Sequence, residues 1–202
     1  RGRVDVFPAP PGPVSFCDNL GQPDVHTCTF QFPPDTAVTL SNGAYPDSKF
    51  TTWAGACGGF QPSCPVFLSG PGPGPLVEAV FLGPRTLTVQ LTSVEGGRGR
   101  VDVSPAPLGP VSFCDNLGQP DVHTCTFQYP PDTAVTLSNQ AYPHSKFTIW
   151  AGACSGSGPG CPVFLSGPGP GRLAEAVFLG PRTLTLSIAS SRGGRGSLAV
   201  DP

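Results

Sequence analysis

Short stretches in which apolar and polar residues alternate run through the whole chain, and residues that favour turns separate them. In "TCTFQF", from Thr27 to Phe32, the side chains of Cys28, Phe30 and Phe32 share one face, as in a half-buried strand. The stretches between are rich in proline, glycine, asparagine and aspartate, as in "PAPPGP" and "GPGPGP". No useful length of sequence repeats apolar residues with the 3.6-residue period of a helix. The pattern predicts an all-β fold.

The expected strands are short and follow one another closely. In the first module they are Arg3–Val6, Val14–Phe16, Thr27–Phe32, Ala37–Ser41, Lys49–Trp53, Pro65–Leu68, Glu78–Phe81 and Thr86–Leu91. Seven or eight strands within about 100 residues match the size of a small β-sandwich. A compact barrel or a β-grasp-like sheet is the alternative.

The chain contains the same module twice. The 97 residues that start at Arg1 align without a gap to those that start at Arg98, and 18 of the aligned positions differ. This repeat predicts two tandem domains. The same offset places "LAVDP" (Leu198–Pro202) on "VDVSP" (Val101–Pro105), so the last residues resemble the opening strand of a third module.

The stretch that joins the two modules suggests where each physical unit begins. "TLTVQLTSVEGGRGRVDV" (Thr86–Val103) is typical of two strands around a glycine-rich turn, which predicts a hairpin, and the pattern recurs from Thr183 to Val200. We therefore expect a first domain at 1–85 that lacks its leading strand and a second domain at 86–182. Residues 183–202 would form a junction hairpin of a third unit or of a neighbouring subunit.

Composition narrows the function classes. Only 12% of residues are charged and the net charge is −2, so the chain lacks the basic surface that nucleic-acid binding requires. No apolar stretch is long enough to span a membrane as a helix. Eight cysteines in a charge-poor, turn-rich chain indicate an oxidising location, either extracellular or at the cell surface.

The cysteines recur at the same places in both modules, two closely spaced pairs in each. Local pairing is favoured, although four cysteines allow three connectivities. The pairs would be Cys17 with Cys28, Cys57 with Cys64, Cys114 with Cys125, and Cys154 with Cys161. Each short loop closed in this way is expected to add about 2.5–3 kcal/mol of stability, which matters for a domain with a thin core.

The order of motifs resembles the divergent B-repeat-like modules of bacterial surface proteins, which are related to the internalin B-repeat. The matching stretches are "GRVDVSPAPLGPVSFC", "CTFQYPPDTAVTLS", "FTIWAGAC", "SGSGPGCPVFL" and "EAVF". The first module supplies "FTTWAGACGGFQPSCPVFL", so the resemblance covers nearly all of both modules. The "GPGPGP" loop and the "PDVHTC" segment depart from it. The resemblance implies an extracellular, non-catalytic spacer or adhesive repeat.

Two groups of residues have side chains that could bind a metal, but a structural role is preferred for both. His26 lies close to the cysteines of the first module, but their spacings are longer than those of structural zinc sites, so disulfides are preferred. Asp18, Asn19 and Asp24 in "CDNLGQPDVHTC" offer oxygen ligands for calcium. Their spacing matches no EF-hand pattern, and these residues are ordinary turn formers. We expect no bound metal and no cofactor.

Trp53 and Trp150 each precede "AGAC" and offer the aromatic surface on which sugars stack. Packing in the core beside a disulfide is the preferred role for both. His144 occupies the position of Asp47 in the other module, so no shared site involves it. Nothing in the sequence favours catalysis, and we expect no enzyme.

These observations predict a structural protein that forms a stalk, fibre or filament from tandem modules. Its partners would be copies of itself or adjacent repeats, joined head to tail through β-strand complementation. The residues expected to complete a neighbour are Thr183, Leu184, Thr185, Leu186, Ser187, Ile188, Leu198, Ala199 and Val200. A surface adhesin that binds a carbohydrate or protein ligand is the alternative function.

Overall fold

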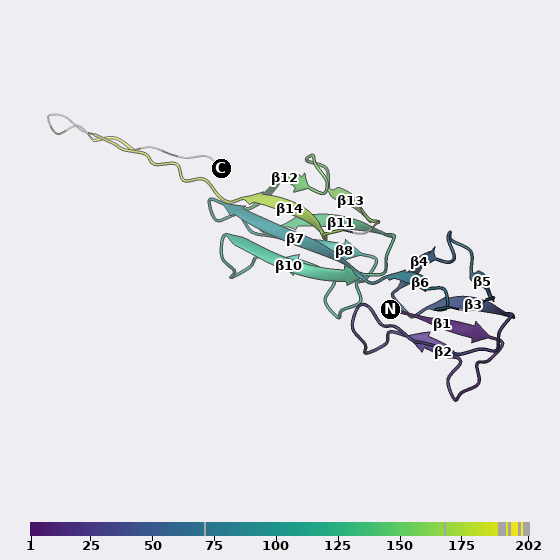
Figure 1. Ribbon diagram of the computed structural model, residues 1–202. Coiled ribbons are helices and arrows are strands. Elements are labelled where there is room, and N and C mark those ends of the chain that lie inside the picture. The colour runs from purple at the N-terminus through teal and green to yellow at the C-terminus, as the bar shows by residue number, and fades with distance from the viewer. Residues whose placement is uncertain (71, 168, 190–192, 194, 198, 200–202) are drawn as a thin grey trace.

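The computed structural model describes residues 1–70, 72–167, 169–189, 193, 195–197 and 199. Every regular element among them is a β-strand (Figure 1). The strands are β1 (Gly2–Phe7), β2 (Phe16–Asp18), β3 (Thr36–Ala44), β4 (Lys49–Gly55), β5 (Ser63–Leu68), β6 (Val77–Leu82), β7 (Arg85–Val94), β8 (Gly99–Ser104), β9 (Phe113–Asp115), β10 (Val122–Tyr129), β11 (Thr133–Ala141), β12 (Lys146–Gly152), β13 (Gly160–Leu165) and β14 (Arg172–Leu179). The all-β prediction is confirmed. The described part contains no helix long and apolar enough to cross a membrane.

The C-terminal half, residues 85–179, is a sandwich of two four-stranded sheets. One sheet has the order β10-β7-β14-β12 and the other β13-β11-β8-β9. Neighbouring strands are antiparallel except β7 and β14, which run parallel. Alternate residues of the two sheets face each other and form one core that includes Tyr129, Leu137, Trp150 and Phe178. The predicted small sandwich is therefore present, rather than a single β-grasp-like sheet.

The N-terminal half, residues 1–82, has only part of this architecture. Its sheet β2-β1-β3-β5 corresponds strand for strand to β9-β8-β11-β13. Its second sheet contains only β4 and β6, the counterparts of β12 and β14. Residues 25–32 match β10 in sequence, yet they form no strand. The prediction of a strand at Thr27–Phe32 is thus wrong for this half, because β10 pairs only with β7, and no strand of the N-terminal half corresponds to β7.

The predicted hairpin at residues 86–103 is also wrong. Both of its strands exist, but β7 and β8 belong to opposite sheets of the sandwich. Each edge of β7 is already paired, with β10 and β14, and β8 is paired with β9 and β11. A tight turn, in which the Gly97 N–H donates to the Val94 carbonyl at 3.0 Å, carries the chain from one sheet to the other. The predicted strand Val14–Phe16 is displaced and appears as β2 at Phe16–Asp18.

All eight cysteines are paired locally, two disulfides in each half, as the sequence predicts. The pairs are Cys17–Cys28, Cys57–Cys64, Cys114–Cys125 and Cys154–Cys161. In the C-terminal half, Cys114–Cys125 joins β9 of one sheet to β10 of the other. In the N-terminal half, Cys17–Cys28 ties residues 25–32 to β2 although they lack a strand partner.

Candidate assembly site

Strand β7 fills the centre of its sheet and supplies much of the core of the C-terminal half. It lies antiparallel to β10, with Leu87 opposite Phe127 and Val89 opposite Cys125. On its other edge it lies parallel to β14. Leu87, Val89 and Leu91 are completely buried, so alternate residues of β7 point into the sandwich. This strand is the element that closes the C-terminal half.

The corresponding position in the N-terminal half is not covered by any described strand. Phe30 and Phe32 are only partly buried, whereas their counterparts Phe127 and Tyr129 are 4% and 0% exposed. The outer edge of β6 pairs with no strand among the described residues, whereas the same edge of β14 is paired with β7. The buried core cluster accordingly contains residues of the C-terminal half alone. The N-terminal half therefore presents an open strand edge beside an uncovered core.

Two glycines mark where a strand would pass. Gly171 and Gly180 flank β14, and a methyl group on either would collide with the backbone around β7, at 2.5 Å from the Thr86 oxygen and 2.1 Å from the Glu95 oxygen. The equivalent residues Gly74 and Gly83 flank β6, and a methyl group there would meet nothing within 4 Å. Both halves thus have glycine at these two positions, but only in the C-terminal half does a neighbouring strand leave no room for a side chain. The sequence alone does not reveal this role, because a glycine next to a proline is typical of a turn. The only sign of it in the sequence is that both glycines recur in the two modules.

A shallow hollow of about 270 Å³ adjoins this open region. Residues 10–14 and 29–31 line it. In the C-terminal half the same loop is fastened to β10, because the Leu108 N–H donates to the Gln128 carbonyl at 2.8 Å. Pro11 takes the place of Leu108 and has no N–H, so this bond cannot form in the N-terminal half. The loop beside the open region is therefore less constrained.

The terminal segment, residues 182–189, repeats the start of β7 in sequence but not in structure. Leu184, Leu186 and Ile188 match the buried Leu87, Val89 and Leu91, yet they are 73%, 49% and 59% exposed. The polar residues Thr183, Thr185 and Ser187 alternate with them. Figure 1 shows the segment leading away from the C-terminal half without joining a sheet. It has the composition of a core strand and no core around it.

The described part of 183–202 contains no strand, and much of the predicted junction hairpin lies outside the described residues, so the hairpin stays a prediction. Ala199 is exposed. Leu198 and Val200 lie outside the described residues. The domain boundaries at 85/86 and 182/183 stay a prediction.

The cysteine and histidine clusters do not provide free metal ligands in this state. The ligand atoms of Cys17, His26 and Cys28 lie within 4.8 Å of one another, and the C-terminal half repeats the arrangement. Both cysteines of each cluster are consumed in a disulfide, whereas zinc binds thiolates. In the loop with candidate calcium ligands, the Asp18 carboxylate accepts a hydrogen bond from the Leu20 N–H, and the Asn19 side-chain oxygen accepts one from the Gly2 N–H. These carboxylate and amide oxygens shape the turn.

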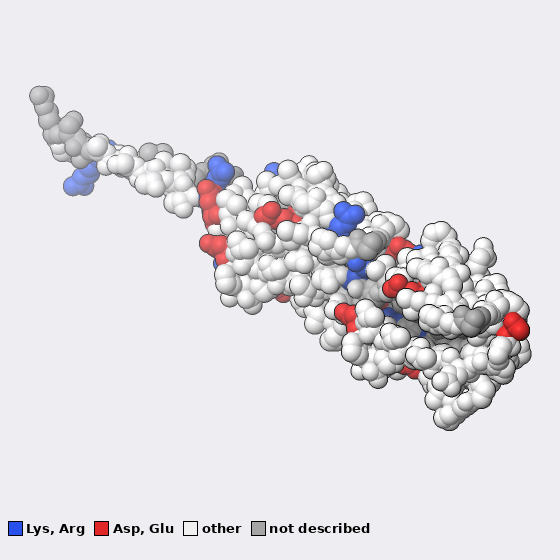
Figure 2. Space-filling model, viewed as in Figure 1, with Lys and Arg blue, Asp and Glu red and all other residues white. Residues whose placement is uncertain are grey.

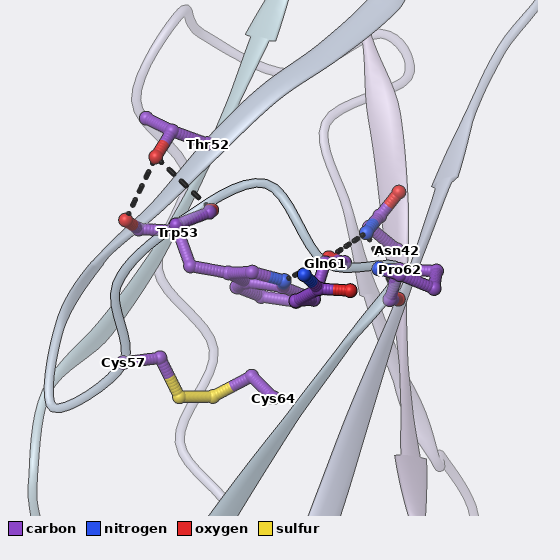
Figure 3. Close-up of a disulfide and its surroundings, with 8 residues drawn as sticks. Asn42, Thr52, Trp53, Cys57, Gln61, Pro62 and Cys64 are labelled. Carbon is purple, nitrogen blue, oxygen red and sulfur yellow. Dashed lines mark hydrogen bonds between the residues drawn. A yellow bond between two sulfur atoms is a disulfide. The ribbon is translucent and has the colours of Figure 1, made fainter.

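Trp53 is a core residue, as preferred from the sequence. It is 2% exposed, its Nε1–H donates to the Gln61 carbonyl at 2.9 Å, and its ring packs against Phe50 at 5.3 Å between centroids. Figure 3 shows the indole beside the Cys57–Cys64 disulfide. Trp150 is equally buried, at 1% exposed. Neither ring offers the open face that sugar stacking requires.

Charged side chains are sparse and scattered over the face shown in Figure 2. Two of the six described ion pairs join residues only two apart in sequence, Arg3 with Asp5 and Arg100 with Asp102. The positive and negative groups alternate, so this face gathers no patch of one sign. Charge therefore marks no interaction site on this face.

Comparison with protein-family models, curated proteins and solved structures finds no match to this chain.

Proposed function

We propose that this chain is a structural module of an extracellular repeat protein, whose units join head to tail through β-strand complementation into a stalk, fibre or filament. One observation carries the proposal. The strand that closes the C-terminal half recurs, exposed, at the end of the chain, while the N-terminal half is open at the position that this strand would fill.

The alignment of the two halves sets how the terminal segment of one copy would lie in the next. It would run antiparallel to residues 25–32, with Leu184 opposite Phe30 and Leu186 opposite Cys28, as β7 does with β10. It would run parallel to β6, with Leu186 beside Val77, as β7 does with β14. The odd-numbered residues of the segment would then point away from the core of the acceptor. This is strand addition at a sheet edge, in which main-chain hydrogen bonds give affinity and alternate side chains give specificity.

Burial of apolar side chains supplies the driving force. Leu184, Leu186 and Ile188 are exposed in the free chain, and full burial of such a side chain stabilises by about 1.5–3 kcal/mol. Ordering the segment on binding costs little conformational entropy, because it is short and follows a proline, whose backbone is already restricted. The donor segment and the open edge are different surfaces, so the contact is heterologous and extends in one direction.

Further observations agree with an extracellular fibre. Four disulfides indicate an oxidising compartment. The resemblance to repeat modules of bacterial surface proteins points to the same kind of protein. The burial of both tryptophans removes the surface on which the alternative of a sugar-binding module depended.

The test is sedimentation velocity over a concentration series, with two single substitutions in the terminal segment. We expect the wild-type chain to form a ladder of oligomers. Leu186→Asp places a carboxylate where the core of the acceptor would be and should abolish the ladder, because burial of an unpaired charge costs several kcal/mol.

Ser187→Asp is the matched control. It adds the same charge one residue away, on the face that corresponds to the partly exposed Gln90 of β7, and should leave the oligomers intact. Both residues are exposed in the free chain and lie outside any sheet. Neither substitution should therefore change the stability of the C-terminal half. A chain that stays monomeric at all concentrations, or equal effects of the two substitutions, would contradict the proposal.

A further inference from the structure

A single ion pair joins the two halves of the chain within the part that the structure describes. Lys49, the first residue of β4, places its Nζ 2.5 Å from Oδ2 of Asp132, which precedes β11. The side chains are 61% and 36% exposed, so the pair lies at the surface of the junction.

Each member of this pair has an equivalent in the other half of the chain. Lys146 begins β12 as Lys49 begins β4, and these are the only two lysines of the chain. Asp35 matches Asp132. Among the described residues, Lys146 and Asp35 take part in no ion pair.

The backbone holds the two aspartates in the same way. The φ angle is 58° at Asp35 and 62° at Asp132. The Asp35 N–H donates to the Leu68 carbonyl at 2.8 Å, and the Asp132 N–H donates to the Leu165 carbonyl at 2.9 Å. Asp35 is therefore presented on its half as Asp132 is presented at the junction.

The connection between units is also repeated. "GPR" links β6 to β7 at residues 83–85, and the same three residues link β14 to the terminal segment at 180–182. Because the linker and the strand that follows it are alike, a segment seated in the next copy would set that copy at the same angle and distance as the C-terminal half has to the N-terminal half. Lys146 would then face Asp35 of that copy.

We propose that Lys146 of one copy forms an ion pair with Asp35 of the next, so that the junction between copies reproduces the junction between the two halves. This inference rests on the proposed function and names the second contact of the same interface. Its consequence is a filament whose repeat is a single module, although each chain carries two.

The experiment measures the association constant of the full chain by sedimentation, with a double-mutant cycle on the pair. Lys146→Glu sets two carboxylates against each other and should weaken association about fivefold to tenfold, more than the loss of an exposed ion pair alone. Asp35→Asn removes one partner and retains a residue type that tolerates positive φ, so the fold should be unaffected.

In the Asp35→Asn background, the effect of Lys146→Glu should fall to about twofold or less, because the repulsion has been removed. Arg172→Glu is the charge-matched control. Arg172 is exposed at the start of β14 and forms no ion pair among the described residues, so its reversal should change association by less than about twofold.

The outcomes separate the two proposals. Oligomers that disappear with Leu186→Asp but show the same loss with Lys146→Glu in both backgrounds would overturn the ion pair and leave strand complementation standing. Oligomers that never form would overturn both. Coupling between Lys146 and Asp35, with no effect of Arg172→Glu, supports the repeated junction.

Discussion

Gly74 and Gly171 occupy equivalent positions but have different surroundings. Strand β7 passes beside Gly171, and no described strand passes beside Gly74. A methyl group on Gly171 would lie 2.5 Å from the Thr86 oxygen, whereas one on Gly74 would meet nothing within 4 Å. Neither glycine has a positive φ, so alanine is not strained by the backbone at either place. Only the occupied site has a steric reason for glycine.

We therefore predict opposite outcomes for the same substitution. Gly171→Ala should destabilise the C-terminal half by about 1–3 kcal/mol, because the core strand must shift to admit the methyl group. Gly74→Ala should leave the monomer as stable as before or about 0.4–1 kcal/mol more stable, through the unfolded chain. Urea unfolding measures both. In assembly, Gly74→Ala should weaken association at least about tenfold; oligomers of normal affinity would show that no strand passes this glycine.

Tyr129 provides a pH test for which the other half supplies a natural control. The side chain is completely buried, and its hydroxyl donates to the Pro105 carbonyl at 3.2 Å. Burial raises the pKa of Tyr129 from 10.0 to about 12. Phe32 stands at the equivalent position and cannot ionise.

The unfolded chain loses the Tyr129 proton near pH 10, whereas the folded chain keeps it until about pH 12. The C-terminal half should therefore lose about 2–3 kcal/mol of stability as the pH rises through this window, and lose none of it below pH 10. Tyr129→Phe should abolish this dependence. Chemical unfolding at a series of pH values measures it, and an unchanged slope in the Phe variant would contradict the assignment.

The sequence indicates some of these residues but not others. The cysteine pairs and the buried tryptophans are predictable, because short spacing favours local disulfides and a tryptophan beside them favours the core. Gly74 and Gly83 are not, since their role depends on a strand distant in sequence. The Lys49–Asp132 pair is missed for the same reason: two isolated charges 83 residues apart carry no local pattern.

At the scale of elements, nearly identical sequences adopt two structures. "VHTCTFQY" forms β10, whereas "VHTCTFQF" at residues 25–32 forms no strand. The alternation of side chains was enough to predict a strand in both, but a strand also needs a hydrogen-bonding neighbour. Only β10 has one, which is β7. The hairpin prediction failed similarly, because the pattern shows two strands and a turn but not which sheet each strand joins.

A peptide that supplies the neighbour should therefore convert residues 25–32 into a strand. We predict that a synthetic peptide with the sequence of residues 181–194 slows amide hydrogen exchange at 25–32, because these N–H groups gain carbonyl partners. The chain used should carry Leu186→Asp, so that its own segment does not compete. The same peptide with aspartate at position 186 is the control and should give no protection. Equal protection by both peptides would show that binding does not use the apolar face.

At the scale of the whole molecule, the two halves share most of their sequence but should not share their stability. The C-terminal half has a closed core, including three completely buried residues from β7, and the N-terminal half lacks that contribution. Two disulfides staple each half, so the difference comes from burial. The monomer should then unfold in two steps, with the N-terminal half first.

The two tryptophans, one in each core, assign the steps. In Trp53→Phe the fluorescence reports Trp150 alone, and in Trp150→Phe it reports Trp53 alone. The chains should also carry Leu186→Asp so that they remain monomeric. We predict that the Trp53 signal changes at a lower urea concentration than the Trp150 signal. The unfolding free energies of the two halves should differ by several kcal/mol, as expected for the loss of three buried aliphatic side chains. The donor peptide should move the Trp53 transition towards that of Trp150 and leave the latter in place, since a ligand that binds only the folded N-terminal half stabilises only that half. If the two transitions coincide without peptide, the N-terminal half is stabilised in some other way, and the proposal that it lacks a strand is contradicted.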